Sequence, residues 1–270
     1  MEMVMLTSTF SRMTKYAPAI AAAIDRNWPQ HPRNYFIADC EVPQIQAQFS
    51  FPAACWTEVL LFGLIQIKGK HPGLTHVFYM IDDHCPLQPC DAEVISAYFE
   101  IARRRDLAAV WFPTFEWPWE TARIEYPTAQ KIDIDIVDGR RLAVVPRDFF
   151  RYFAVQPACW NLDYLIKACK VALDKGIRDT WAFEALQWEG AARHFVADYN
   201  WPSVHHGFMA AGNINPTAIA YMSRTNAAEL RGQLLRDSIG INNAALYRMY
   251  CRVRRLGHAV KTRLRPVCAR

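Results

Sequence analysis

The feature that most constrains the fold is the alternation of extended and helical patterns over the first 112 residues. Runs rich in β-branched and aromatic residues predict strands at 4–10, 35–38, 76–81 and 107–112. Apolar residues at helical spacing predict the intervening helices at 16–28, 56–67 and 92–104, the last of them capped by Asp91. This order is typical of an α/β protein with a Rossmann-like, mostly parallel central sheet flanked by helices.

The second half of the chain departs from this alternation. Isoleucines alternate with aspartates from Ile132 to Ile136, and Asp138-Gly139 precedes a further apolar run, which predicts a small β-hairpin over 132–145. The other expected elements are a strand at 153–155, a helix at 162–175 ended by Gly176, a short helix capped by Asp179, and helices at about 227–237 and 243–260. With 52% hydrophobic residues, the chain has enough apolar side chains for one large core. We expect a catalytic domain over 1–240 and a basic helical C-terminal extension over 241–270.

Charge is unevenly distributed along the chain. The 270 residues carry a formal net charge of +5, but the segment from Arg248 to Arg270 holds eight Lys and Arg and neither Asp nor Glu. The remainder therefore carries −3, which disfavours nucleic-acid binding by the folded body. The basic segment is either a solvated helix or a contact with anionic lipid headgroups, which attract basic residues by about 1 kcal/mol each.

Several locations and function classes are disfavoured by what the sequence lacks. We expect neither a signal peptide nor a membrane span, because the longest apolar run, 59–67, is far shorter than the roughly 20 residues of a spanning helix. The eight cysteines form no Cys-x-x-Cys pair, so a zinc site or disulfide framework is not expected, and the chain is placed in the cytoplasm. The absence of Gly-x-Gly-x-x-Gly, P-loop and Gly-x-Ser-x-Gly motifs disfavours dinucleotide-binding enzymes, P-loop NTPases and serine hydrolases.

Two adjacent aspartates follow the most apolar of the expected strands. Ligands of a parallel sheet bind beyond the carboxyl ends of its strands, where Asp82 and Asp83 are expected. Two carboxylates leaving a buried strand are unfavourable unless a positive charge meets them, and a divalent cation that bridges phosphates is the usual partner. In the structural alternative, Asp83 caps the turn at Pro86 and Asp82 pairs with an arginine.

Several short stretches, in a particular order, give the chain a resemblance to a known group of enzymes. These stretches are Thr7-Ser8-Thr9, Asn27-Trp28-Pro29, Trp56, the run from Phe78 to Asp83, the run from Arg151 to Trp160, and the run from Thr180 to Glu184. Over about residues 4–215 the pattern resembles nucleotide-diphospho-sugar glycosyltransferases of the GT-A type, in particular small bacterial enzymes of capsule or O-antigen polysaccharide synthesis. The resemblance implies a GT-A-like fold and transfer of a sugar from a nucleotide-sugar donor to a glycan or lipid-linked acceptor hydroxyl.

The resemblance also implies residues on the donor side. Those that would line the nucleotide pocket are Thr7, Ser8, Thr9 and Asp39. Asp82 and Asp83 would stand for the family's Asp-x-Asp or Glu-Asp-Asp element, which binds the diphosphate and a cation, Mg²⁺ or Mn²⁺. The chain departs from both forms, because Ile81 replaces the leading acid of one and His84 the trailing acid of the other.

Glu184 is the candidate general base. An inverting transfer needs a carboxylate to take the proton of the acceptor hydroxyl. On a helix, Trp181, Glu184 and Trp188 fall on one face, so the two rings could stack on a sugar beside the carboxylate. The alternative is an ordinary core stripe with Glu184 at its margin. A retaining mechanism also stays open, because a linear sequence does not fix the face of the donor on which Glu184 lies.

Further candidates come from two other segments. The resemblance adds Arg151 and Trp160 to the acceptor side, with a core position as the alternative for Trp160. His205 and His206 precede Gly207 in a loop-rich region. In GT-A enzymes a late histidine can complete the metal shell, and imidazole beside carboxylates suits Mn²⁺, so His206 is a candidate ligand alongside the two aspartates. A merely polar loop is the alternative.

The sequence therefore predicts a glycosyltransferase of cell-surface polysaccharide synthesis, cytoplasmic and peripheral at the inner face of the membrane through its basic C-terminal segment. Two other classes stay open. One is a metal-dependent phosphoester hydrolase or nucleotidyltransferase that uses the same acidic strand end. The other is a non-catalytic partner in a membrane-associated assembly, recruited by the basic segment.

Overall fold

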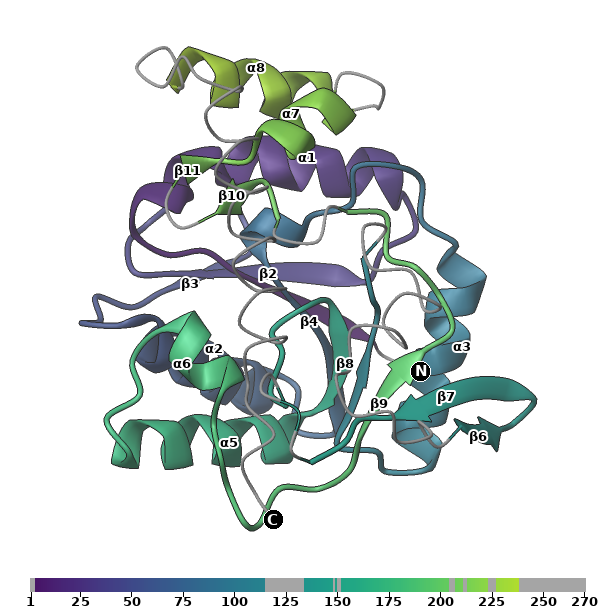
Figure 1. Ribbon diagram of the computed structural model, residues 1–270. Helices are drawn as coiled ribbons and strands as arrows, with labels where there is room; N and C mark the ends of the chain where they lie inside the picture. Colours follow the sequence, from purple (N-terminus) through teal and green to yellow (C-terminus); the bar gives the residue numbers. More distant parts are fainter. Residues whose placement is uncertain are drawn as a thin grey trace, which may run out of the picture.

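A nine-stranded mixed sheet forms the centre of the protein in the computed structural model (Figure 1), which describes residues 3–114, 134–147, 149, 152–203, 207–210, 213–222 and 227–237. Its strands are β1 (Val4–Ser8), β2 (Arg33–Ala38), β3 (Gln48–Ser50), β4 (His76–Ile81), β5 (Ala109–Trp111), β6 (Ile134–Val137), β7 (Arg140–Val144), β8 (Ala158–Asn161) and β9 (His194–Ala197). The order across the sheet is β3-β2-β1-β4-β8-β5-β9-β7-β6.

The strand directions correct the expectation of a mostly parallel sheet. Within the described residues, four of the eight neighbouring strand pairs are parallel and four are antiparallel. The antiparallel pairs arise because β8 lies between β4 and β5 in the opposite direction, and because β7 turns back beside β9. The pairings leave β1, β2, β4, β5 and β9 running the same way, so their carboxyl ends meet at one edge.

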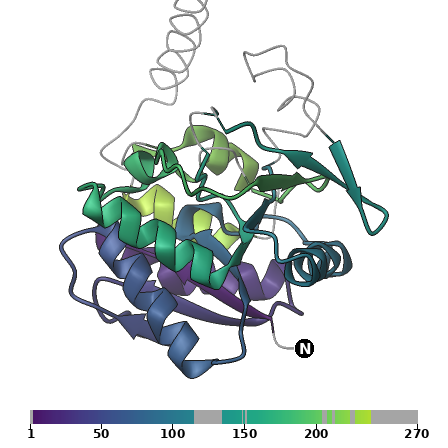
Figure 2. The same ribbon diagram turned by 90° about the horizontal axis from the view of Figure 1, so that it is seen from below.

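Helices cover both faces of the sheet. One face is packed by α1 (Ala17–Asn27), α3 (Ala92–Arg104), α7 (Pro216–Met222) and α8 (Ala228–Asp237). The other face is packed by α2 (Trp56–Lys70), α5 (Leu162–Asp174) and α6 (Thr180–Glu184). Figures 1 and 2 show these layers, with the sheet between α1 and α2. The short 3₁₀ segments are η1 (Ser11–Tyr16) and η2 (Asp82–His84).

Side-chain alternation in the strands builds a core on each face of the sheet. In β4, Phe78 and Met80 belong to the core under α1 and α3, whereas Val77 and Tyr79 belong to the core under α2 and α5. Strands buried on both faces lack polar alternation. This explains why β4 was the most apolar of the expected strands.

Local capping fixes the helices next to the sheet edge. The Asp91 carboxylate accepts a hydrogen bond from the Val94 N–H (3.0 Å), as expected, and starts α3. The Asp179 carboxylate accepts one from the Ala182 N–H (2.9 Å) and starts α6. Each cap satisfies a donor that the first helical turn leaves free.

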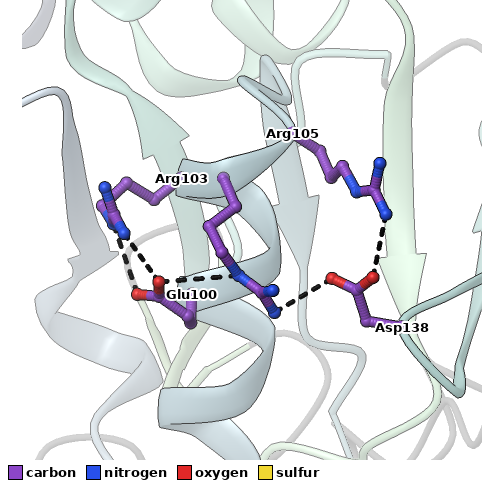
Figure 3. A network of polar contacts seen from close by, with 5 residues as sticks. Glu100, Arg103, Arg105 and Asp138 are labelled. Atoms are coloured by element: carbon purple, nitrogen blue, oxygen red, sulfur yellow. Dashed lines mark hydrogen bonds and ion pairs between the residues drawn. The ribbon is translucent and has the colours of Figure 1, made fainter.

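The expected hairpin is confirmed as β6 and β7, which extend from one side of the body in both views. Asp138 and Gly139 both have positive φ, 51° and 77°, in the two-residue turn. An ion-pair network joins this turn to the end of α3 (Figure 3). In it, Asp138 pairs with Arg104 and Arg105 at 2.9 Å each, and Glu100 pairs with Arg103 at 2.7 Å.

Two expectations for the second half need correction. The segment 153–155 is not a strand, and the strand lies instead at β8. The backbone of residues 153–155 bonds to Glu184 and not to a neighbouring strand: the Phe153 N–H donates to the Glu184 carbonyl (3.2 Å). The loop expected after residue 200 also contains α7 and a small hairpin of β10 (Met209–Ala210) and β11 (Asn213–Ile214). The helix expected at 243–260 lies outside the described residues.

Candidate active site at the carboxyl ends of the strands

The carboxyl ends of β1, β2 and β4 bring the first candidate residues together. Ser8 is in register with Ile37 on one side and Ile81 on the other. The residues that follow these strand ends, Thr9 and Asp82, therefore lie side by side, as parallel pairing requires. The carboxyl-end edge of the sheet, where the sequence predicts Asp82 and Asp83, is formed as expected.

Asp82 is a buried acid with only part of its carboxylate satisfied. Its Oδ1 accepts a hydrogen bond from the Asp83 N–H (2.8 Å), whereas its Oδ2 is buried without a hydrogen-bond partner among the described residues. Burial raises the pKa of Asp82 to about 7. The Thr9 hydroxyl and nearby backbone N–H groups lower the pKa of Asp82, although the Thr9 hydroxyl does not reach standard hydrogen-bond geometry. An arginine partner, the structural alternative for Asp82, is not found within the described residues.

Asp83 is the second unsatisfied acid of the site. Its side chain is 16% exposed, and its Oδ1 has no hydrogen-bond partner in the described part of the chain. The His84 ring lies nearby, with Nε2 3.9 Å from that oxygen. Burial, followed by the negative charges of Asp82 and Glu184, raises the pKa of Asp83 well above its usual range. A carboxyl with these surroundings is stabilised by a proton or by a bound cation.

Glu184 reaches this site from a distant part of the sequence. It ends α6 and is buried, with 7% of its surface exposed. Its Oε1 accepts a hydrogen bond from the Val155 N–H at 3.4 Å. Its charge acts on Asp83, so the structure brings the candidate base and the two strand-end acids into one electrostatic cluster.

The fold separates Trp181 from Trp160 and Trp188, which both stack on Phe153 and Tyr164. Trp181 lies on α6 with 53% of its surface exposed, one turn before Glu184. The helix ends at Glu184, so Trp188 does not continue its face as a longer helix would; it stacks on Tyr164 at 5.5 Å. Trp160 is fully buried, which favours the core position that the sequence left open. Only Trp181 presents a largely exposed ring.

The other predicted site residues differ in what they offer a ligand. Thr7 and Ser8 are buried, and their hydroxyls bond within the fold, to Asn34 Oδ1 (3.0 Å) and to the Tyr79 hydroxyl (2.7 Å). Asp39 is partly exposed directly after β2. The residues that lie outside the described part of the chain are Arg151, His205 and His206.

One residue of the site was not predicted. Gly207 has a φ of +63°, and its Cα packs directly against Asp83. Its only sequence signal is its place after the two histidines. This contact joins the segment after β9 to Asp83, which follows β4.

The fit of the site to a divalent cation depends on its carboxylates. Within the described residues, His, Cys, Asp and Glu side chains form no group of three or more that could hold a metal ion. The two buried carboxylate oxygens without hydrogen bonds, Asp82 Oδ2 and Asp83 Oδ1, nevertheless suit a hard cation whose other ligands are water and phosphate oxygens. Asp82 and Asp83 are therefore the residues that could hold Mg²⁺ or Mn²⁺ together with a diphosphate.

The sequence matches no model of a known protein family and no curated protein. In the part of the chain that the structure describes, no helix has both the length and the apolar character needed to cross a bilayer.

Proposed function

We propose that the protein is a GT-A-type glycosyltransferase that moves a sugar from a nucleotide-sugar donor to a hydroxyl of a glycan or lipid-linked acceptor in cell-surface polysaccharide synthesis. One observation carries the proposal: Asp82 and Asp83 hold two buried carboxylate oxygens without a hydrogen-bond partner among the described residues, and the charge of Glu184 acts on Asp83. A fold retains such a cluster at a stability cost when the acids serve a function.

In the proposed reaction Glu184 is the general base. It takes the proton as the acceptor oxygen attacks the anomeric carbon, while the bond from that carbon to the diphosphate oxygen breaks and the nucleoside diphosphate leaves. Inversion at the anomeric carbon is the favoured outcome of this single displacement. The hydrogen bond from the Val155 N–H holds the Glu184 carboxylate in place.

On the donor side, Asp83 and Asp82 would bind the diphosphate through a divalent cation. When bound, such a cation neutralises the charge that develops on the leaving diphosphate. Thr9 and Asp39, which follow the two neighbouring strands, would contact the nucleotide. On the acceptor side, the exposed ring of Trp181 is one helical turn from the base and could stack on a sugar.

A thermal-shift screen of nucleotide sugars, with and without Mn²⁺, tests this function. We expect one intact sugar nucleotide to raise the melting temperature selectively. Asp83→Asn should abolish the shift, and Asp174→Asn, at an exposed acid of α5, should not. Hydrolysis of a nucleotide substrate without any acceptor sugar would favour a phosphoester hydrolase or nucleotidyltransferase. No shift with any nucleotide would favour a non-catalytic partner.

We further propose that the basic segment 248–270 holds the enzyme at an anionic membrane surface, where lipid-linked acceptors are found. Deleting this segment should reduce co-sedimentation with anionic liposomes at low salt and leave turnover of a soluble acceptor unchanged, because exposed charges are screened as salt rises. Unchanged sedimentation of the truncated chain would exclude this role.

A further inference from the structure

The open end of the hairpin formed by β10 and β11 lies against Asp83. The Phe208 N–H donates a hydrogen bond to the Asp83 carbonyl (3.1 Å). On the other side of the hairpin, the Asn215 N–H donates to the Phe208 carbonyl (2.9 Å), and Asn215 Nδ2 donates to the Gly207 carbonyl (3.1 Å). Gly207 and Phe208 are thus joined to Asp83 on one side and to Asn215 on the other.

This arrangement is anchored in the core. Phe208 is fully buried and makes an edge contact with Tyr16, at 6.4 Å between ring centroids. Asn215 is also buried, with 4% of its surface exposed, and the Ile219 N–H donates to its carbonyl (3.1 Å) in the first turn of α7. The hairpin end is therefore held by both packing and hydrogen bonds, so its position against Asp83 is well defined.

Gly207 makes a contact with Asp83 that no other residue type could make. A methyl group at position 207 would lie 2.5 Å from Asp83 Cγ and 2.6 Å from both Oδ2 and the carbonyl oxygen of Asp83. Gly176 also has a positive φ, +72°, yet a methyl group there would meet nothing within 4 Å. Backbone conformation alone would explain a glycine at both positions. The close approach to Asp83 is particular to Gly207.

The contact also fixes how the Asp83 carboxyl is oriented. Gly207 packs against the side of Oδ2, and Oδ1 is buried without a hydrogen-bond partner among the described residues. We infer that Gly207, braced by Asn215, is a positioning residue that fixes the orientation of the Asp83 carboxylate toward a cation and its diphosphate. The contact between Gly207 and Asp83 does not depend on the proposed function. The role of Asp83 as a ligand of the cation does rest on that function.

The first test compares Gly207→Ala with Gly176→Ala as its matched control. Both variants place a β-carbon at a positive φ, so both should lose thermal stability, but only Gly207→Ala also displaces Asp83. Mn²⁺ alone is titrated calorimetrically into each folded variant. We expect Gly207→Ala to bind Mn²⁺ roughly 10- to 100-fold more weakly than the wild type, as is typical when a residue that orients a ligand is lost. Gly176→Ala should bind it with wild-type affinity.

A second test, by thermal unfolding without metal, measures the contact itself. Gly207→Ala should lower the melting temperature by less in an Asp83→Ala background than in the wild type, because the carboxyl no longer collides and only the backbone carbonyl of residue 83 still does. Gly176→Ala should lower it equally in both backgrounds. Equal losses for Gly207→Ala would show that the Asp83 carboxyl takes no part in the contact and would overturn the inference.

The two tests separate the inference from the proposed function. Wild-type Mn²⁺ affinity in Gly207→Ala, with the sugar-nucleotide shift intact, would overturn the positioning role and leave the transferase standing. A wild-type protein that binds neither Mn²⁺ nor any sugar nucleotide would overturn the proposed function, and with it the ligand role of Gly207.

Discussion

Two buried polar clusters lie at opposite ends of the strands and differ in how their hydrogen bonds are completed. At the amino end of β9, His194 Nδ1 donates to the Tyr152 carbonyl (2.6 Å), and Nε2 accepts from the Tyr164 hydroxyl (2.9 Å). That hydroxyl in turn accepts from the Ala192 N–H (3.1 Å). At the carboxyl end of β4, oxygens of Asp82 and Asp83 have no such partners within the described residues.

This is the difference we expect between a structural cluster and a site that binds a ligand. The His194 ring is fully buried, and burial lowers its pKa to about 3, so it is neutral and both ring nitrogens are used inside the fold. Asp82 Oδ2 and Asp83 Oδ1 are also buried, but no described residue completes their hydrogen bonds, as a proton or a bound ligand would. Unsatisfied buried groups are rare in native proteins and call for such an explanation.

Replacing the candidate base should affect chemistry without affecting the fold. Glu184→Gln keeps the shape of the side chain and an oxygen that can accept from the Val155 N–H, but it cannot take a proton. Turnover should fall by about 10²- to 10⁴-fold, with donor binding retained. Product formation is measured with the sugar nucleotide identified in the thermal-shift screen. Glu189→Gln, an exposed acid five residues away, is the control. Near-normal turnover in Glu184→Gln would show that another group is the base.

Replacing the buried imidazole should affect the fold. His194→Ala removes a ring that stacks on Tyr152 at 4.3 Å and bonds to the Tyr164 hydroxyl. We expect the free energy of unfolding to fall by about 3 to 5 kcal/mol, the range for deleting a large buried ring. Urea unfolding followed by circular dichroism measures it. A loss below about 1 kcal/mol would contradict the structural role, because even one unpaired hydrogen-bonding group costs that much.

The acids at the carboxyl edge should destabilise the protein as pH rises. The pKa of Asp82 is raised to about 7 in the folded state and lies near 4 in an unfolded chain. Between these values the folded state binds more protons, so the free energy of unfolding should fall as pH rises from about 4 to 7. In metal-free protein at pH 8, Asp82→Asn should then be more stable than the wild type by about 1 to 3 kcal/mol.

This advantage should shrink as the pH falls to 4 and below, where Asp82 becomes protonated in both states. Urea unfolding at several pH values measures the profile. A wild-type protein whose stability rises with pH over the same interval would contradict the buried, unpaired environment of Asp82.

The smallest effect is expected from a single hydroxyl of the satisfied cluster. Tyr164→Phe keeps the ring but removes the group that joins His194 Nε2 to the Ala192 N–H. Leaving these two groups unpaired should lower the free energy of unfolding by about 1 to 2 kcal/mol. Urea unfolding at neutral pH provides the value. An unchanged midpoint would mean that water replaces the hydroxyl, and it would weaken the contrast between the clusters.

What the sequence could predict was determined by short-range patterns. The bounds of β4 and α3 and the turn at Asp138-Gly139 follow from apolar spacing, a cap and a turn dipeptide, all of which act over a few residues. The place of β8 could not be predicted in this way. Residues 153–155 are as rich in apolar and aromatic side chains as β8, and the choice depends on Glu184, which binds their backbone from about 30 positions away.

Prediction of the candidate site was also limited to features that a few neighbouring residues determine. The position of Asp82 and Asp83 at a strand end is a local property and was predicted. The approach of Glu184 to Asp83 depends on how α6 packs, and the burial of Trp160 depends on the neighbours of β8. Gly207 was missed because an isolated glycine does not reveal whether it serves a turn or a close contact.

The central position of β8 has a consequence for how the chain is made. β4 and β5 are complete by residue 111, yet both have their inner edge against β8, which ends at Asn161. During synthesis on the ribosome, the nascent sheet would therefore expose two unpaired edges for about fifty residues of elongation. Exposed edges invite pairing with other chains, and such long-range closure is slow. We expect the emerging chain to depend on protection by chaperones until β8 leaves the exit tunnel.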